Sequence, residues 1–83
     1  MGTGRVVTIT DVLGVMREFE PYEPAGIGTG LIAWELHRPE AAIRPLIERA
    51  SAAGWIAPAG RDRRSGEELW RLTTHGRAQV AAA

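Results

Sequence analysis

The spacing of apolar and polar positions predicts a helix near the start of the chain. Its apolar residues lie three and four positions apart, which places them on one face of an α-helix. We expect this helix over residues 10–20, with Thr10 as its N-cap and Pro21 ending it. Residues 1–8 are predicted to form a loose arm. The apolar run 6–9, which overlaps its end, is expected to be a short strand or a packed segment. The inward-facing residues are Val12, Leu13, Val15, Met16 and Phe19.

Two more helical patterns follow, with only a short break between them. The first predicts a helix over 30–37 that Thr29 caps. The second predicts a helix over 41–53, and Gly54 occupies the position after it where glycine is most common. The short break at Pro39 therefore indicates a tight turn. The inward-facing residues are Ile32, Ala33 and Leu36 in the first helix, and Ile43, Leu46, Ile47 and Ala50 in the second.

Proline and glycine interrupt these patterns at two places. A proline in a helix interior costs about 3 kcal/mol, and we expect Pro45 to avoid most of this cost by lying in or just past the first turn of its helix. The stretch 21–30 holds two prolines and three glycines, which predicts a loop with Ile27 in a short strand. Its glycine spacing does not fit a dinucleotide-binding loop, and a chain without lysine has no Walker motif.

Alternation of apolar and polar residues predicts a β-hairpin over 55–72, with a polar, turn-rich tip. Because proline cannot donate a hydrogen bond to a neighbouring strand, Pro58 indicates that the first strand is short or lies at an edge. In the second strand, Trp70 and Leu72 share one face. We expect Thr73 or Thr74 to cap a C-terminal helix over 74–81.

The order of these elements predicts an α+β fold in one domain, 1–83: a three-helix core, a two- or three-stranded β-wing and a C-terminal helix. The segment Trp70 to Arg77 reads Trp-Arg-Leu-Thr-Thr-His-Gly-Arg, and Gly54-Trp55-Ile56 precedes it at the start of the hairpin. Together with Ala33, Leu36, Ile43 and Leu46, these segments resemble the winged helix-turn-helix domains of bacterial MarR-type and PadR-type transcriptional regulators. The resemblance covers about half of the chain, from residue 33 to residue 77.

This resemblance implies that the chain binds double-stranded DNA, with the helix 41–53 as the recognition helix in the major groove. The wing would contact the DNA backbone or the minor groove. Arginine can pair with guanine edges or phosphates, small residues can approach thymine methyl groups, and glutamate can accept a hydrogen bond from cytosine. The candidate DNA-binding residues are Ala41, Ala42, Arg44, Pro45, Glu48 and Arg49 on the helix, and Arg61, Arg63 and Arg64 on the wing.

Charge leaves a second interpretation open. The formal net charge is zero, whereas DNA-binding domains are typically basic. The acidic residues dominate the first 36 positions and the arginines dominate the rest. Arg44 and Arg49 could pair with Glu40 and Glu48 along their own helix. The alternative function is a winged helix that binds a partner protein, and self-association as a homodimer is also open.

Composition argues against several other classes. The chain has no cysteine, and its two histidines lack partners at metal-ligand spacing. No catalytic arrangement is evident, so we expect no enzyme activity, no cofactor and no metal. No apolar run approaches the length of about 20 residues that spans a membrane, and the N-terminus lacks a signal peptide. We expect a bacterial cytoplasmic protein, and its three tryptophans, Trp34, Trp55 and Trp70, are expected to pack in the core.

Overall fold

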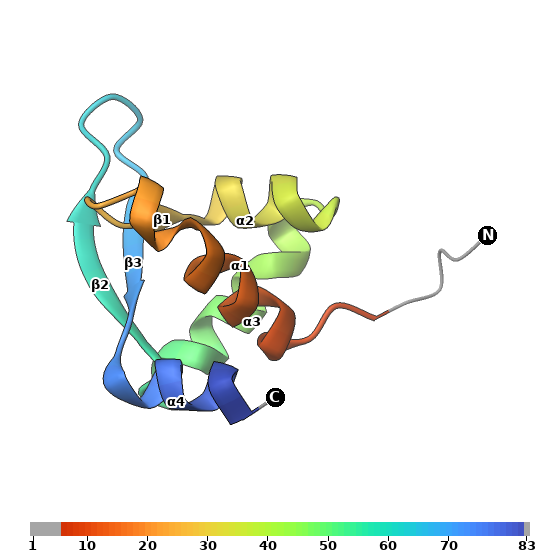
Figure 1. The fold of residues 1–83 in the computed structure, drawn as a ribbon. Coiled ribbons are helices and arrows are strands. Elements are labelled where there is room, and N and C mark those ends of the chain that lie inside the picture. Colours follow the sequence, from red (N-terminus) through yellow and green to blue (C-terminus); the bar gives the residue numbers. More distant parts are fainter. Residues whose placement is uncertain (1–5, 83) are drawn as a thin grey trace.

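The computed structural model describes residues 6–82 and has an α+β fold, in which helices cover one face of a small antiparallel sheet (Figure 1). The α+β winged helix prediction is confirmed. The helices are α1 (Ile9–Phe19), α2 (Thr29–Leu36), α3 (Glu40–Ala52) and α4 (Thr74–Ala82), and a 3-10 turn, η1 (Glu20–Tyr22), follows α1. The strands are β1 (Ile27–Gly28), β2 (Ile56–Arg61) and β3 (Glu68–Leu72).

The three strands lie in the order β1-β3-β2. Ile27 pairs with Trp70, so the loop before α2 supplies the third strand of the wing sheet. Pro58 lies in β2, at the edge of the sheet as predicted, where its missing N–H costs no ladder bond. The pairing shifts between Pro58 and Gly60, which is a β-bulge that bends the wing strand.

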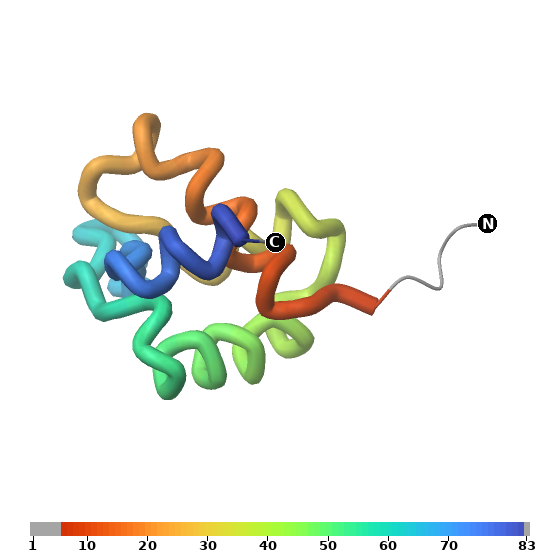
Figure 2. The backbone as a smooth tube through the Cα atoms, turned by 60° about the horizontal axis from the view of Figure 1, so that its bottom comes forward, coloured from red at the N-terminus to blue at the C-terminus, as the bar shows by residue number. Residues whose placement is uncertain are grey.

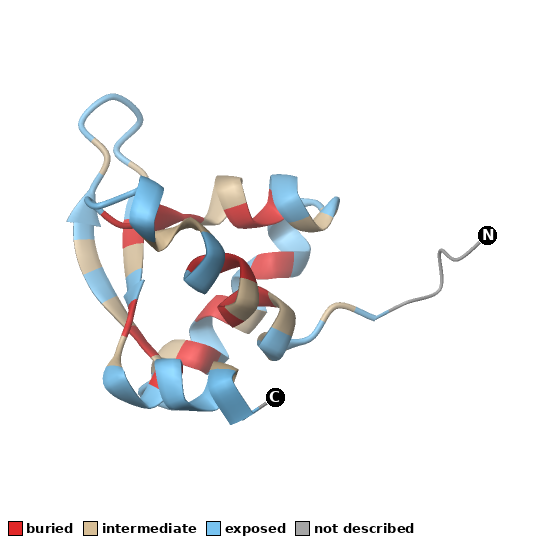
Figure 3. Cartoon of the chain, viewed as in Figure 1, coloured by how far each residue is buried: buried red, intermediate tan, exposed pale blue. Residues whose placement is uncertain are grey.

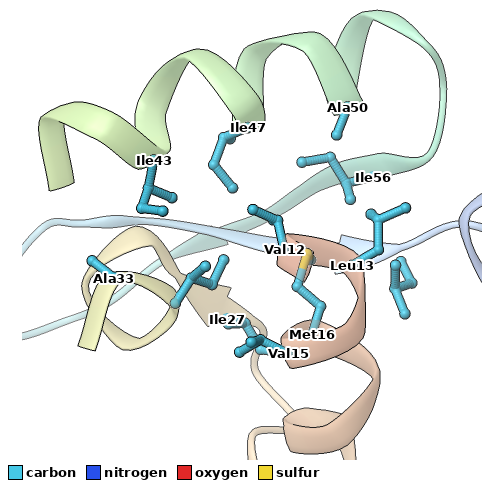
Figure 4. Close-up of a cluster of buried hydrophobic side chains, with 12 residues drawn as sticks. Val12, Leu13, Val15, Met16, Ile27, Ala33, Ile43, Ile47, Ala50 and Ile56 are labelled. Atoms are coloured by element: carbon cyan, nitrogen blue, oxygen red, sulfur yellow. The ribbon is translucent and has the colours of Figure 1, made fainter. Parts of the chain in front are cut away.

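One apolar cluster joins α1, α2, α3 and the sheet (Figures 3 and 4). Figure 4 shows α3 on one side of this cluster and α1 on the other, with their apolar faces toward each other. The buried members are Val12, Leu13, Val15, Met16, Ile27, Ile32, Ala33, Ile43, Ile47, Ala50, Ile56 and Leu72. Phe19, Leu36 and Leu46, which were also predicted to face inward, are partly buried against it.

The starts of α1 and α2 differ from the prediction. Thr8, not Thr10, caps α1: its hydroxyl accepts a hydrogen bond from the Asp11 N–H, and the Asp11 carboxylate accepts one from the Thr8 N–H. This reciprocal pair is a capping box, and it starts the helix one residue early. Residues 6–8 form no strand, but Val7 and Ile9 pack against the core, as the alternative of a packed segment predicted. Residues 1–5 of the predicted loose arm lie outside the described residues. Thr29 is the first residue of α2, and Gly28 is its N-cap.

The turn between α2 and α3 is tight, as predicted. His37 ends α2 in the left-handed region at φ 55°, and the Arg38 N–H reaches back to the Ala33 carbonyl at 3.0 Å. Pro39 is the N-cap of α3, so Pro45 is the sixth residue of that helix, deeper than predicted. At this depth its ring removes the bond that the Ala41 carbonyl would accept, and both residues are exposed to solvent.

The motif from Leu72 to Arg77 joins the wing to α4. Leu72 is buried in the core, and the Thr73 hydroxyl caps α4 by accepting from the Gly76 N–H at 3.0 Å. The same hydroxyl donates to the Gly54 carbonyl at 2.6 Å. Gly76 lies against the Trp55 carbonyl, where a Cβ would collide. Figure 2 shows α4 beside α1, and Arg77 forms a bidentate ion pair with Glu20 at 2.6 and 3.0 Å.

One of the three tryptophan predictions is wrong. Trp55 and Trp70 are partly buried against the core, as expected. Trp34 instead lies on the outer side of α2 and is 77% exposed. Its neighbours Ile32 and Ala33 already fill the inward face of that short helix.

Candidate nucleic-acid interface

The outer face of α3 carries all six of the candidate residues predicted for that helix. Because the apolar side of α3, with Ile43, Ile47 and Ala50, points into the core (Figure 4), the residues on the opposite side of the helix point to solvent. Each of the six is exposed: Ala41, Ala42, Arg44, Pro45, Glu48 and Arg49.

The two arginines of α3 differ in their partners. Arg44 forms an ion pair with Glu40, one helical turn earlier, at 3.4 Å. Both side chains are largely exposed, so this pair contributes little to stability. Arg49 has no hydrogen bond or ion pair within residues 6–82 and is free to contact a ligand. The pairing that the sequence left open is therefore present for Arg44 alone.

The wing tip is held by its own hydrogen bonds. The Asp62 carboxylate accepts from the backbone N–H groups of Arg64 and Ser65 at 2.8 and 2.9 Å. These bonds lower the pKa of Asp62, because they stabilise its charged form. Arg61 donates to the Gly66 carbonyl at 2.8 Å across the base of the loop. Asp62, the one acid of the tip, is thus bound to the loop backbone.

Arg63 and Arg64 lie within this hydrogen-bonded loop. Both are exposed, and neither side chain has a partner in the part of the chain that the structure describes. Arg61, by contrast, has a structural contact. Of the three wing arginines that the sequence singled out, Arg63 and Arg64 are the two that remain available to an anion.

An open groove of about 710 Å³ separates α3 from the wing. Its lining includes Ile47 and the partly buried Trp70, with charged residues on both walls. Four of these are glutamates and two are arginines: Glu40, Glu48, Glu67 and Glu68, with Arg44 and Arg61. The sequence prediction overlooked the acidic character of this groove. The sequence signal for it was the adjacent pair Glu67 and Glu68, where β3 begins, together with Glu48 on the outer face of α3.

Glu67 also joins the wing to α2. Its carboxylate accepts a hydrogen bond from the Gly30 N–H at 2.8 Å. Gly28, the N-cap of α2, has no side chain that could cap the helix, and a Cβ there would collide with the Glu67 carboxylate. The anion therefore lies at the positive end of the helix dipole, where it is stabilising. Sequence patterns cannot reveal this contact because the two residues are 37 positions apart.

Neither a metal site nor a membrane span emerges from residues 6–82. No three side chains of the metal-binding types gather there, and no helix has the length and apolarity to cross a bilayer.

Comparison with known proteins identifies the fold. No protein-family model and no curated protein matches the chain. Among solved structures, a variant of S. aureus MepR matches with a TM-score of 0.73 and 21% identity, over 89% of this chain and 51% of that one. The S. aureus MepR–DNA complex matches with a TM-score of 0.70 and 22% identity, over 89% of this chain and 50% of MepR.

A third match agrees in length as well as in fold. A putative DNA-binding protein from Ralstonia eutropha has a TM-score of 0.71 and 26% identity, and the match covers 95% of this chain and 96% of that one. The chain spans about half the length of the MepR structures. These similarities establish that the chain has the winged helix fold of MepR and of the protein from R. eutropha.

Proposed function

We propose that this chain binds double-stranded DNA as a transcriptional regulator or as the DNA-binding module of one. In the proposed complex α3 enters the major groove, and the wing contacts the backbone or the minor groove. The observation that carries the proposal is the shared groove: the outer side of α3 and the wing adjoin across it, and unpaired arginines stand on both elements. The same proposal holds that the chain acts in the bacterial cytoplasm and has no catalytic activity.

On α3, the proposed contacts follow from side-chain size and charge. Ala41, Ala42 and Pro45 are small and exposed, so the helix can approach base edges and thymine methyl groups closely. Arg49 can donate two hydrogen bonds to guanine, and Glu48 can accept one from cytosine. Arg44 can reach a phosphate or a base after leaving Glu40, which costs little at an exposed pair.

On the wing, Arg63 and Arg64 supply the proposed backbone contacts. The hydrogen bonds of Asp62 to the loop backbone fix the turn from which these two side chains project. A fixed loop loses less entropy on binding than a flexible one. Arg61 supports the loop through Gly66 and can still face the DNA with its remaining N–H groups.

Two of the similar structures support this proposal. MepR has been captured in complex with DNA, and the protein from R. eutropha is described as a putative DNA-binding protein. Both have the same fold as this chain, although fold alone does not fix function.

The test is a binding titration of the full chain with a labelled DNA duplex at low salt. We expect the double variant R63A/R64A to weaken binding and to reduce the salt dependence, because each phosphate contact contributes about 0.9 to the logarithmic slope. R17A is the control for charge loss, with one charge removed instead of two, because Arg17 is exposed on α1 and does not line the groove. If R17A and R63A/R64A weaken duplex binding by the same factor per charge removed, the proposed wing contacts are wrong.

Selection of bound sequences from a random DNA pool then tests sequence specificity. Enrichment of a motif supports a regulator with α3 in the major groove. We expect R49A to relax the preference at one position of that motif, since direct base contacts are worth about 1–3 kcal/mol each. A pool without any enriched motif would remove the sequence-specific part of the proposal.

A protein-binding winged helix is the second candidate. Trp34, exposed on α2, and the zero net charge favour it. If this candidate holds, W34A abolishes capture of a partner while R63A/R64A has no effect. Self-association is part of the same question, because dimeric helix-turn-helix proteins bind two half-sites about one helical turn apart. Sedimentation of the chain with and without a selected duplex distinguishes one bound copy from two.

A further inference from the structure

The groove between α3 and the wing lies where the proposed complex brings a DNA strand. The major and minor grooves of a duplex are separated by one sugar-phosphate strand. If α3 occupies the major groove and the wing reaches the neighbouring minor groove, that strand must pass over the groove between them. This step rests on the proposed function.

The charges in this groove are unfavourable for a phosphate strand. Four glutamates line it against two arginines. The arginines are already engaged, since Arg44 pairs with Glu40 and Arg61 donates to the Gly66 carbonyl. The free arginines, Arg49, Arg63 and Arg64, do not line the groove.

Two of the glutamates have no compensating partner. Glu48 and Glu68 are exposed, on α3 and at the start of β3, and neither side chain has a hydrogen bond or ion pair within residues 6–82. Arg61 is the residue opposite Glu68 across the two strands, yet its guanidinium turns to Gly66 instead. No ion pair or hydrogen bond within the described residues therefore offsets either carboxylate where a phosphate strand would cross the groove.

We propose that the groove carboxylates, Glu48 and Glu68 above all, are specificity determinants that suppress binding to DNA of arbitrary sequence. Non-specific affinity comes almost entirely from phosphate neutralisation by basic residues. A carboxylate near the phosphate strand opposes this term at every sequence. At a matching sequence Glu48 accepts a hydrogen bond from cytosine, so part of the repulsion is offset at that sequence alone.

The double variant E48Q/E68Q tests this inference. Glutamine keeps the size of each side chain and removes its charge, and it replaces one acceptor oxygen with an NH2 donor. We expect its affinity for a random-sequence duplex at about 0.1 M salt to rise about thirtyfold, because the two removed repulsions near a phosphate are worth about 1 kcal/mol each in water. The ratio of affinities for selected and random duplexes is expected to fall.

The matched control is E18Q/E23Q, which changes the net charge by the same amount. Glu18 and Glu23 are exposed and do not line the groove. We expect this control to change random-duplex affinity by less than about twofold at about 0.1 M salt, where charges beyond about 10 Å are largely screened.

The outcomes separate this inference from the function on which it rests. If DNA binds and R63A/R64A weakens it, but E48Q/E68Q gains no more than E18Q/E23Q, the specificity role is wrong and the proposed function stands. If the wild type and every variant fail to bind DNA at low salt, both are wrong. A gain confined to E48Q/E68Q supports both.

Discussion

The Glu67 carboxylate at the base of the wing accepts a hydrogen bond from the Gly30 N–H at 2.8 Å, and this bond caps α2 from a distant part of the chain. Helix α2 has no side-chain cap of its own. The first helix of the helix-turn-helix and the wing are therefore connected directly as well as through the sheet. A change at Glu67 is expected to affect both the stability of the fold and the orientation of the wing.

For Glu67, we expect E67A to lower the free energy of unfolding by about 1 kcal/mol, the usual cost of losing a helix N-cap. E67Q should lose less, because the amide oxygen can still accept the Gly30 N–H. Urea denaturation of the three proteins measures the difference. A stability for E67A equal to that of the wild type would mean that the cap contributes nothing.

Gly76 is the position where we expect the largest loss from a single methyl group. In G76A the new Cβ collides with the Trp55 carbonyl, so α4 must move away from the wing. We expect a loss of more than about 2 kcal/mol, in the range of overpacked cores. Thermal unfolding measures it.

The matched substitution G14A should act in the opposite direction. Gly14 is inside α1, and a Cβ there meets no atom within 4 Å. Alanine has the higher helix propensity, so we expect a gain of about 0.5–1 kcal/mol. Similar losses in G14A and G76A would contradict the assignment of the effect to the Trp55 contact.

His37 ends α2 in a conformation that favours glycine, at φ 55°. We expect H37G to stabilise the protein by about 0.5–1 kcal/mol, because the left-handed region costs a residue with a Cβ about 1–2 kcal/mol and the greater backbone entropy that glycine loses on folding offsets part of this gain. H75G provides the contrast: His75 is exposed in the first turns of α4, where glycine should destabilise. Chemical denaturation of both variants measures the change in the free energy of unfolding, and a lower value for H37G than for the wild type would contradict the prediction.

Asp62 makes the wing tip sensitive to acid. The backbone hydrogen bonds from Ser65 and Arg64 lower its pKa in the folded protein. A lowered folded pKa gives stability that is present above the unfolded pKa and is lost as pH falls through the folded value. We expect NMR titration to place the Asp62 carboxyl below its ordinary pKa, and the Arg64 and Ser65 amide signals to shift at the same pH. A carboxyl that titrates at or above the ordinary value would show that these bonds are absent in solution.

Sequence patterns predicted α1 and α3 well because each of these two helices has a clear apolar face. The run from Ile43 to Ala50 has helical spacing, so its inward and outward faces could be read directly. The outward face then defined the candidate residues on α3, and all of them are exposed. Gly54 was also correctly predicted as the end of α3; it has φ 79°.

Helix ends and single residues were predicted less well. Thr8 is the N-cap in place of Thr10, because Asp11 is three residues after Thr8 and completes the reciprocal capping box. Trp34 was expected in the core, but α2 has only eight residues and one narrow inward face. In both cases the residue type alone suggested the role, whereas the spacing along the helix decides which residue caps it and which side chains face inward.

The sequence by itself determined the order of the elements, the apolar faces, and the outward-facing residues of α3, because these depend on spacing within one element. The tertiary structure alone decided which charges meet. Glu67 reaches Gly30 over 37 positions, and Glu20 reaches Arg77 over 57. It also decided that Arg61 is held by the wing while Arg63 and Arg64 are free, and that four glutamates gather between α3 and the wing. Such contacts depend on how separate elements pack, and no local periodicity records that.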